Sequence, residues 1–164
     1  MENLFKTDCI RTSSGIYINV FEPTEEMICI EDIAHSLAHQ CRFGGHLPEF
    51  YSVAQHSVLC SLMVPEKLKL QALLHDASEA YLLDMPKPIK ERLPDYKKIE
   101  DNLMQVIAKK FGFSYPLGKE VKAADGRLLE MEWNDLMLDS KTEQCWNSQK
   151  AKSNFMAHFR ILTK

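Results

Sequence analysis

The sequence predicts an all-α protein with a small β-hairpin at its N-terminal end. Apolar residues alternate only near the N-terminus, and from about residue 30 onward they recur at helical spacing between stretches rich in glycine and proline. The length of 164 residues, 45% of them hydrophobic, suits a single domain with its own core. We expect a hairpin region over 1–27, a helical core over 28–138, and a loop with a final helix over 139–164.

The hairpin is predicted from a period of two in the first part of the chain. Ile16, Ile18 and Val20 stand at every second position, as in a strand with one buried face. Residues 13–15 read Ser-Ser-Gly and supply a turn, and residues 9–11 can form the other arm. A short antiparallel pair is therefore expected in front of the helices.

Two helices are predicted next, one on each side of a break. Ile33, Leu37 and Cys41 recur at a spacing of four residues from about residue 30. Residues 42–48 contain two glycines and a proline, which end that helix. Residues 52–55, Ser-Val-Ala-Gln, fit a capping box, so a second helix is expected from there to residue 64.

The following helices are bounded by proline and glycine. A continuous helix is expected over 66–83. Residues 84–88, Asp-Met-Pro-Lys-Pro, predict a rigid loop because each proline fixes its own φ angle. Pro94 can open the next helix, and Gly112 is its natural stop.

The C-terminal part of the chain is expected to be helical at both of its ends. One helix is predicted over 119–138, and the polar residues 140–153 are predicted to form a loop. Phe155, Phe159 and Leu162 then indicate a short final helix.

Composition excludes several classes of protein. The formal net charge is −3 and no long basic run is present, so a nucleic-acid partner is not expected. The sequence contains no run of eighteen apolar residues, so no membrane span is expected. Charged residues interrupt the N-terminal apolar stretch, which therefore does not resemble a signal peptide. The five cysteines are scattered without a CxxC pair, which is typical of reduced thiols in the cytoplasm.

Two polar residues stand where the predicted helix over 66–83 should be buried. His75 and Asp76 interrupt a run of apolar residues, and an unpaired buried charge there would be strongly destabilising. A bound cation would compensate Asp76. Glu79 lies four residues after His75 and three after Asp76, so on a continuous helix all three would share one face.

Asp125 is likewise a charged residue at a position expected to be buried, in the helix over 119–138. Its position places it on the apolar face that contains Val121 and Leu128. The neighbouring Gly126 weakens a helix, and a close approach of another backbone would explain it. His56 also lies on the inner face of its own helix.

Each of these residues alone has an ordinary interpretation, as a hydrogen-bonded core histidine, a cap, a salt bridge or an exposed glutamate. As a set, two imidazoles and two carboxylates suit zinc, manganese, iron, cobalt or nickel better than calcium, and they leave positions open for water and substrate. His35 and His39, four residues apart, could form an alternative metal site, although no glutamate lies between them at the zincin position. His46 and His158 are expected at the surface or in loops.

The spacing His56, His75-Asp76, Asp125 resembles the H…HD…D signature of the HD superfamily. The words YSVAQH, LLHDASEAYLLDMPKPIKERLPDYKKIED and KAAD are similar to the bacterial 5′-deoxynucleotidase branch of that superfamily. The stretch CRFGGHLPEFYSVAQH is most similar to the dATP triphosphohydrolases of phages that replace adenine with 2-aminoadenine. The resemblance covers residues 28–135, and the residues after about 138 match only loosely.

The resemblance implies a role for each matching residue. It assigns the catalytic metal to four ligands, His56, His75, Asp76 and Asp125. Glu79 would orient or activate the attacking water, and Asp84 would position water or the leaving group and could join a second metal site. The substrate would be held by four further residues, Arg42 and Lys90 on phosphate oxygens and Phe43 and Pro88 against the deoxyribose. The alternative for both cations, and for the weaker candidate Lys87, is a solvated surface position.

The expected function is metal-dependent hydrolysis of a deoxynucleotide. The leading expectation is a dATP or dNTP triphosphohydrolase that releases deoxynucleoside and tripolyphosphate. The alternatives are a 5′-deoxynucleotidase acting on dNMPs and a non-catalytic, nucleotide-binding HD regulator. The implied cofactor is zinc, cobalt or manganese, with a second divalent ion, magnesium, manganese or cobalt, beside the substrate. We expect a homo-oligomer, dimer or hexamer, in the cytoplasm of a bacterial or phage-infected cell, with neither nucleic acid nor membrane as a partner.

Overall fold

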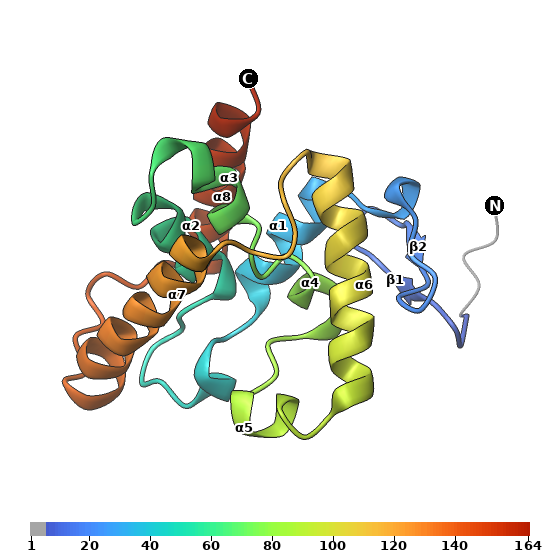
Figure 1. Cartoon of the computed structure of the whole chain (residues 1–164). Helices are drawn as coiled ribbons and strands as arrows, with labels where there is room; N and C mark the ends of the chain where they lie inside the picture. The colour runs from blue at the N-terminus through green and yellow to red at the C-terminus, as the bar shows by residue number, and fades with distance from the viewer. Residues whose placement is uncertain (1–5) are drawn as a thin grey trace.

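The computed structural model describes residues 6–164 and confirms the predicted fold class: helices pack around a main hydrophobic core and a smaller second cluster, and a two-stranded hairpin lies beside them (Figure 1). Residues 1–5, the beginning of the expected hairpin region, lie outside the described residues. The elements in chain order are β1 (Ile10–Arg11), β2 (Tyr17–Ile18), η1 (Glu25–Met27), α1 (Ile30–His39), η2 (Phe43–Gly45), α2 (Val53–Leu62), η3 (Glu66–Leu68), α3 (Lys69–Leu73), α4 (Glu79–Leu82), α5 (Lys87–Lys90), α6 (Pro94–Phe111), α7 (Lys119–Glu132), the π-helical segment η4 (Trp133–Leu138) and α8 (Ser148–Leu162).

The hairpin forms as predicted and is attached to α1 by a buried carboxylate. Strands β1 and β2 pair antiparallel, with Ile10 opposite Ile18, and Ile18 is fully buried. The hydroxyl of Ser13 donates to Asp32 Oδ1 at 2.7 Å, and the hydroxyl of Ser14 donates to Asp32 Oδ2 at 2.6 Å. Because the backbone N–H of Ser14 also donates to Oδ1, both oxygens of this buried carboxylate have partners.

The core is built by α1, α2 and α8, with α3 and α4 packed against them. Helix α2 begins as the capping box predicts, since the Ser52 hydroxyl accepts from the backbone N–H of Gln55. In a complete capping box the Gln55 side chain would also bond the backbone N–H of Ser52. Here it makes a tertiary contact instead. The buried Gln55 amide donates to the Gln144 carbonyl and accepts from the Trp146 N–H, both at 2.8 Å. It thereby attaches the C-terminal segment to α2.

The prediction of one continuous helix over 66–83 is wrong. The chain forms η3 and α3, leaves helical geometry over 74–78, and resumes as α4 at Glu79. Between the two helices the backbone turns tightly, with Ala77 N–H donating to the Leu74 carbonyl and Glu79 N–H donating to the Asp76 carbonyl. His75 and Asp76 therefore lie in a turn between two helices, where their side chains are not restricted to one helix face.

Helix α6 confirms the prediction from proline and glycine. It begins at Pro94, and Gly112 ends it in the left-handed conformation with φ of 74°. The predicted rigid loop over 84–88 is only partly correct, because Lys87 and Pro88 begin the one-turn helix α5. Proline is compatible with the first turn of a helix, where its missing N–H is not required.

Two predictions for the C-terminal part need correction. Helix α8 begins at Ser148, inside the predicted loop over 140–153, because the Asn147 side chain accepts from the Lys150 N–H and caps it. Gly126 is not explained by a close approach, since an added Cβ would meet no atom within 4 Å. None of the helices in residues 6–164 combines the length and the apolar character needed to cross a membrane.

Candidate metal centre

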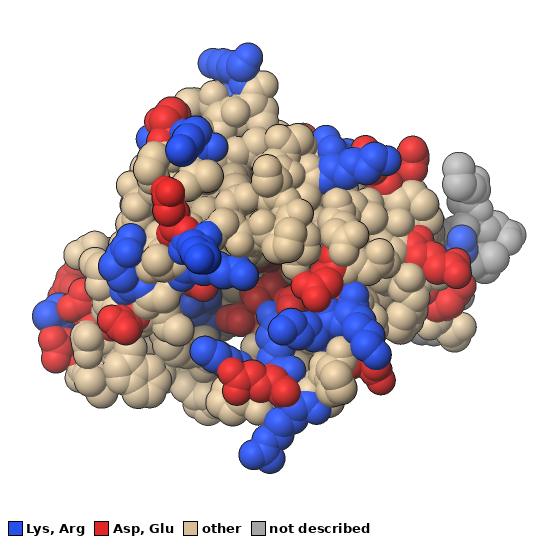
Figure 2. Space-filling view, viewed as in Figure 1, with Lys and Arg blue, Asp and Glu red and all other residues tan. Residues whose placement is uncertain are grey.

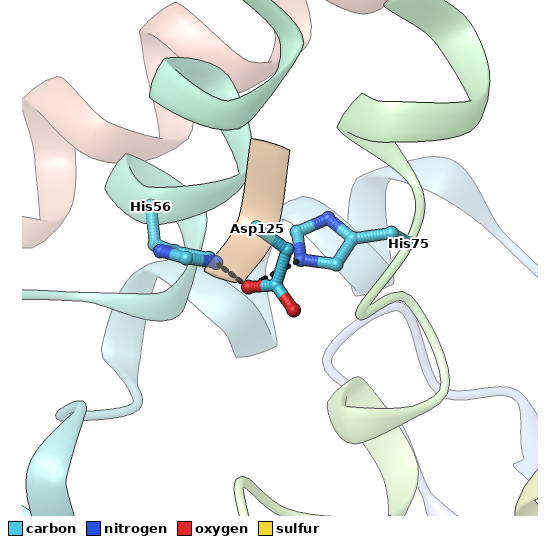
Figure 3. A group of neighbouring side chains, drawn as sticks. All are labelled: His56, His75 and Asp125. Carbon is cyan, nitrogen blue, oxygen red and sulfur yellow. Dashed lines mark hydrogen bonds and ion pairs between the residues drawn. The ribbon is translucent and has the colours of Figure 1, made fainter. Parts of the chain in front are cut away.

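Three separate elements bring His56, His75 and Asp125 together (Figure 3). His56 comes from α2, His75 from the turn after α3, and Asp125 from α7. Asp125 Oδ1 lies 3.0 Å from His56 Nε2 and 3.7 Å from His75 Nε2. One ligand atom from each residue lies within 4.8 Å of the others, and no other such group occurs within residues 6–164. This cluster could hold a metal ion.

Asp76, the fourth predicted ligand, lies beside this triad. Its Oδ2 atom is 3.1 Å from His75 Nε2 and 3.9 Å from His56 Nε2. All four predicted ligands therefore lie close together, although Asp76 comes from a turn and Asp125 keeps 42% of its side chain exposed. Both findings differ from the sequence periodicity, which predicts that the two carboxylates are buried in helices.

The hydrogen bond of His75 identifies which ring nitrogen faces the site. Its Nδ1 atom lies 2.6 Å from the carbonyl oxygen of Ala72, which can only accept, so Nδ1 carries the hydrogen. Although burial opposes it, Asp76 and Asp125 raise the pKa of His75 well above its usual value, so the ring is neutral only when a cation takes the place of the proton. In that neutral ring, Nε2 would point a lone pair at Asp76 and Asp125. That Nε2 atom is buried and has no hydrogen-bond partner. A cation between the lone pair and the carboxylates would satisfy all three groups.

His56 is arranged in the same way by a carboxylate. Its Nδ1 atom lies 2.6 Å from Glu132 Oε1, and the ring is fully buried. A hydrogen on Nδ1 leaves the Nε2 lone pair directed at Asp125. Metal-binding histidines generally donate their second ring N–H to a carboxylate or a carbonyl, and here one histidine does each. The donor set and its supporting hydrogen bonds therefore fit a divalent transition metal.

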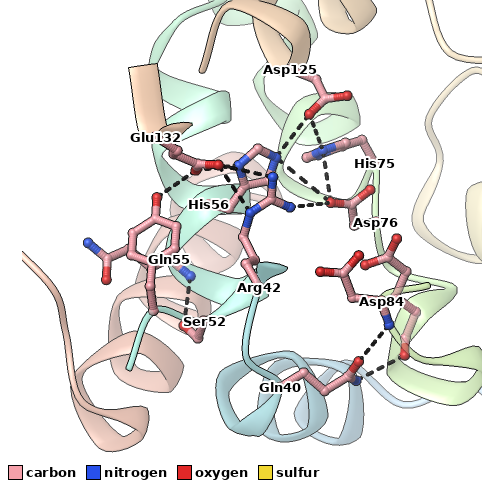
Figure 4. A network of polar contacts seen from close by, with 12 residues as sticks. Gln40, Arg42, Ser52, Gln55, His56, His75, Asp76, Asp84, Asp125 and Glu132 are labelled. Atoms are coloured by element: carbon pink, nitrogen blue, oxygen red, sulfur yellow. Dashed lines mark hydrogen bonds and ion pairs between the residues drawn. The ribbon is translucent and has the colours of Figure 1, made fainter. Parts of the chain in front are cut away.

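Glu132 is a residue of this site that sequence reasoning missed. It is buried and binds three side chains from different parts of the chain (Figure 4). Besides His56, its carboxylate accepts from the Tyr51 hydroxyl at 2.7 Å and from Arg42 Nε at 3.1 Å. Its spacing of seven residues from Asp125, two helical turns along α7, was a signal that could have found it.

The charges of the cluster favour the ionised carboxylates. Burial alone would raise the pKa of Asp125, but the neighbouring His56 and His75 rings outweigh it and hold the pKa below its ordinary value. Burial likewise opposes the ionisation of Asp76, yet the neighbouring His75 lowers its pKa to about 2. The pKa of Glu132 is lowered against its burial by the contact with His56 and the charge of Arg42. The site therefore concentrates negative charge beside two imidazoles, as cation binding requires.

Glu79 is buried at the start of α4, with 5% of its surface exposed, so the interpretation as an exposed helical glutamate is wrong. One of its oxygens, Oε2, has no hydrogen-bond partner, and Oε1 is 3.9 Å from Lys90 Nζ. Burial and the charges of Asp76 and Asp84 raise the pKa of Glu79 well above its usual value. A carboxyl group in this state can both take and give a proton.

Gln40, also missed by sequence reasoning, holds the backbone on both sides of this helix. Its amide nitrogen donates to the Glu79 carbonyl at 2.9 Å, and its amide oxygen accepts from the Asp84 N–H at 3.1 Å (Figure 4). Between them Leu83 adopts φ of 70°, a strained value for a residue with a Cβ. The two hydrogen bonds of Gln40 fix the backbone position from which the Asp84 side chain extends. Burial raises the pKa of the Asp84 carboxyl.

A cavity of about 1160 Å³ opens in front of the candidate metal ligands. It forms the hollow between α7 and the α5–α6 side, with acidic residues at its floor and basic residues around it (Figure 2). Eight of the ten predicted site residues line it: Arg42, Phe43, Asp76, Glu79, Asp84, Pro88, Lys90 and Asp125. The other two, His56 and His75, are buried and do not line the cavity. They contact Asp76 and Asp125 from the interior of the protein. His46, expected at the surface or in a loop, is exposed and also lines the cavity.

The two predicted phosphate-binding cations line the cavity and are both paired. Arg42 is buried, so a solvated surface position is wrong for it, and its Nε and Nη2 atoms bind Glu132. Its Nη1 atom, 3.9 Å from Asp76 Oδ2, faces the metal centre. Lys90 Nζ lies 2.5 Å from Glu100 Oε1. Lys87, the weaker candidate, lines the cavity with 82% of its side chain exposed.

The alternative metal pair, His35 and His39, gains no third ligand within residues 6–164. The two rings are tilted by 31° with centroids 4.3 Å apart, and His39 Nδ1 is hydrogen-bonded to the His35 carbonyl at 2.7 Å. This geometry is that of two histidines on one turn of α1. The structure therefore does not support the alternative site.

The fold and the site together define the class of this protein: it is an all-α protein in which two buried histidines and a partly exposed aspartate form a cluster that could hold a metal ion. No family model matches the chain. It is 48% identical over 130 residues to "Uncharacterized protein YfdR" of Escherichia coli (strain K12), a match that covers 79% of this chain and 73% of YfdR. A second relative, "Uncharacterized protein RCAP_rcc00048" of Rhodobacter capsulatus, is 36% identical over 129 residues, which cover 70% of this chain and 66% of the relative. The chain belongs to the family of YfdR.

Proposed function

We propose that this protein is a metal-dependent phosphohydrolase of the HD type that acts on deoxynucleotides, with dNTPs, dATP first among them, as substrates. One observation carries the proposal. The Nε2 atoms of His56 and His75 point at the carboxylate of Asp125, which lies on the wall of a cavity that also contains a buried glutamate and several cations. A metal centre with an open side, a proton acceptor and anion-binding groups is what phosphoester hydrolysis needs.

Each residue has a distinct task in the proposed reaction. The four ligands would hold a divalent ion, which would supply Lewis acidity and lower the pKa of water in the site. Glu79 accepts the proton of the attacking water at Oε2, the oxygen without a hydrogen-bond partner. Arg42 Nη1 and Lys90 Nζ bind the non-bridging phosphoryl oxygens and neutralise their charge as it grows. Asp84, held in place by Gln40, orients the water or the leaving group.

The cations favour a triphosphate over a monophosphate. Arg42, Lys87 and Lys90 all line the same cavity, and a triphosphate chain can engage all three. Attack at the α-phosphate would release the deoxynucleoside and tripolyphosphate. A 5′-deoxynucleotidase would use the same metal, glutamate and cations on a dNMP, so the product distinguishes the two activities.

The decisive experiment compares substrates with metal-loaded protein. Protein loaded with manganese or cobalt is incubated separately with dATP, dGTP and dAMP, and the products are resolved by chromatography. Tripolyphosphate from dATP supports the triphosphohydrolase, and phosphate from dAMP alone supports the 5′-deoxynucleotidase. If no nucleotide is hydrolysed while the protein binds both metal and dATP, the protein is a nucleotide-binding regulator and the hydrolase proposal is wrong.

A further inference from the structure

One wall of the cavity is a single face of α7 and η4 that extends away from the metal centre. The lining residues on this wall recur every four positions, at Asp125, Leu129, Trp133 and Met137. This spacing places them on one side of the helix. The wall begins at a metal ligand and continues with large apolar side chains, of which Leu129 is 39% exposed and Trp133 is 48% exposed. The charged end of the cavity therefore passes into an apolar end.

Trp133 stands where α7 changes to the π-helical segment η4. Such segments are rare and are frequent at functional sites. Its ring lies 6.2 Å from the ring of Phe43 and is tilted to it by 48°. The guanidinium group of Arg42 lies 5.6 Å from the centre of the same Phe43 ring. An aromatic corner thus adjoins the cation that faces the metal centre.

Asn134 lines the cavity next to Trp133. Its side-chain amide offers two hydrogen-bond donors and an acceptor, and it is exposed. A helical side chain leans toward the N-terminal end of its helix, so the Trp133 indole reaches back toward Asp125 along the wall. Trp133 and Asp125 are eight residues apart, which separates their Cα atoms by about 12 Å in an α-helix.

We infer that Trp133 and Asn134 form the subsite for the nucleobase, with Trp133 stacking on its face and Asn134 bonding its edge. The inference rests on the proposed function for the identity of the ligand. A ligand that carries phosphate at one end and a flat aromatic group with a polar edge at the other matches the cavity from end to end. Stacking of a base on an aromatic side chain is strong and tolerates any base, so Asn134 is the residue that discriminates between bases.

The two tryptophans of the chain allow a direct test by fluorescence. Trp133 lines the large cavity, whereas Trp146 lines a separate one of about 490 Å³. The Trp146→Phe variant therefore reports on Trp133 alone, and the Trp133→Phe variant reports on Trp146 alone. Both metal-loaded proteins are titrated with deoxyadenosine, which carries the base without phosphate, and with inorganic tripolyphosphate, which carries phosphate without the base.

Saturable quenching of the Trp146→Phe protein by deoxyadenosine is expected, with little change on adding tripolyphosphate and no quenching of the Trp133→Phe protein. Equal responses to both ligands, or a response of Trp146 alone, would overturn the subsite. Quenching by deoxyadenosine in a protein that hydrolyses no nucleotide would support the subsite and refute the hydrolase. Hydrolysis without any quenching would support the hydrolase and refute the subsite.

Kinetics provide the second measurement. Trp133→Ala is expected to raise KM for dATP about tenfold, since base stacking is lost, and to leave kcat nearly unchanged. Asn134→Ala is expected to change the ratio of kcat/KM for dATP to that for dGTP, which Trp133→Phe should preserve. Leu138→Ala is the matched control, because Leu138 lies in the same π-helical segment, is 62% exposed and does not line the cavity. An unchanged KM in Trp133→Ala, with the fold intact by circular dichroism, would contradict the inference.

Discussion

Two buried acidic sites in this protein differ in how completely their atoms are paired. Asp32 is 3% exposed, and the hydroxyls of Ser13 and Ser14 with one backbone N–H satisfy both of its oxygens. At the metal centre, by contrast, His75 Nε2 and Glu79 Oε2 are buried without a hydrogen-bond partner. A fully paired buried charge holds the fold together, whereas unpaired groups beside a cavity point to a ligand that completes them.

The largest effect is expected from removing the ligand that both histidines face. Asp125→Ala should abolish metal binding and lower kcat/KM by about 10³-fold or more, because the ion contributes several kcal/mol to the transition state. Elemental analysis of purified protein measures the metal directly. Asp95→Asn, a change at an exposed acid far along the chain, is the control. Full metal content in Asp125→Ala would contradict the assignment of this ligand.

Glu79→Gln is expected to separate metal binding from catalysis. The amide keeps the shape of the buried side chain but cannot accept the proton of the attacking water, so kcat should fall about 10²-fold or more while bound metal is retained. Metal content and kcat are measured on the same preparation. A near-normal kcat would show that another group takes the proton.

A smaller effect is expected at Glu132, which binds His56 rather than the metal. Glu132→Gln weakens the carboxylate–histidine contact and removes the nearer of the two ionic partners of Arg42, so metal affinity should fall about 10- to 100-fold. Competition with a chelator measures the affinity. Because Tyr51 also binds Glu132, Tyr51→Phe serves as a matched variant that removes one hydrogen bond from the same carboxylate. An unchanged metal affinity in Glu132→Gln would mean that His56 is oriented without it.

The fully paired site should affect stability and not activity. Burial alone would raise the pKa of Asp32, but the bonds from Ser14 and Ser13 outweigh it and lower the pKa. Since the folded pKa is the lower one, the stabilisation is present above the unfolded pKa and is lost as pH falls through the folded pKa. Asp32→Ala should therefore lower the free energy of unfolding at neutral pH by about 1–3 kcal/mol, a loss that shrinks in acid.

Denaturant unfolding at several pH values measures this difference, with the exposed Asp8→Ala as control. Metal content and kcat should stay unchanged in Asp32→Ala. A loss of metal from this variant would remove the distinction between the two acidic sites.

Several features of this protein could be predicted from the sequence. The hairpin with its Ser-Ser-Gly turn, the Ser52 cap of α2 and the Gly112 end of α6 are local, since a few neighbouring residues determine each. The four candidate metal ligands could be found as well, because polar residues at inward positions contradict the surrounding apolar pattern. Local patterns also failed in places, since α8 begins at Ser148, inside the predicted loop over 140–153.

The sequence by itself determined the fold class and the residue types available for a metal, since periodicity records which face of each helix is buried. Only the tertiary structure decided how those faces meet. It placed His75 and Asp76 in a turn, brought Glu132 onto His56, and set Trp133 on the cavity wall. The reason is physical: hydrogen bonds within one turn depend on neighbours in sequence, whereas the convergence of side chains from α2, the turn after α3 and α7 depends on how whole helices pack.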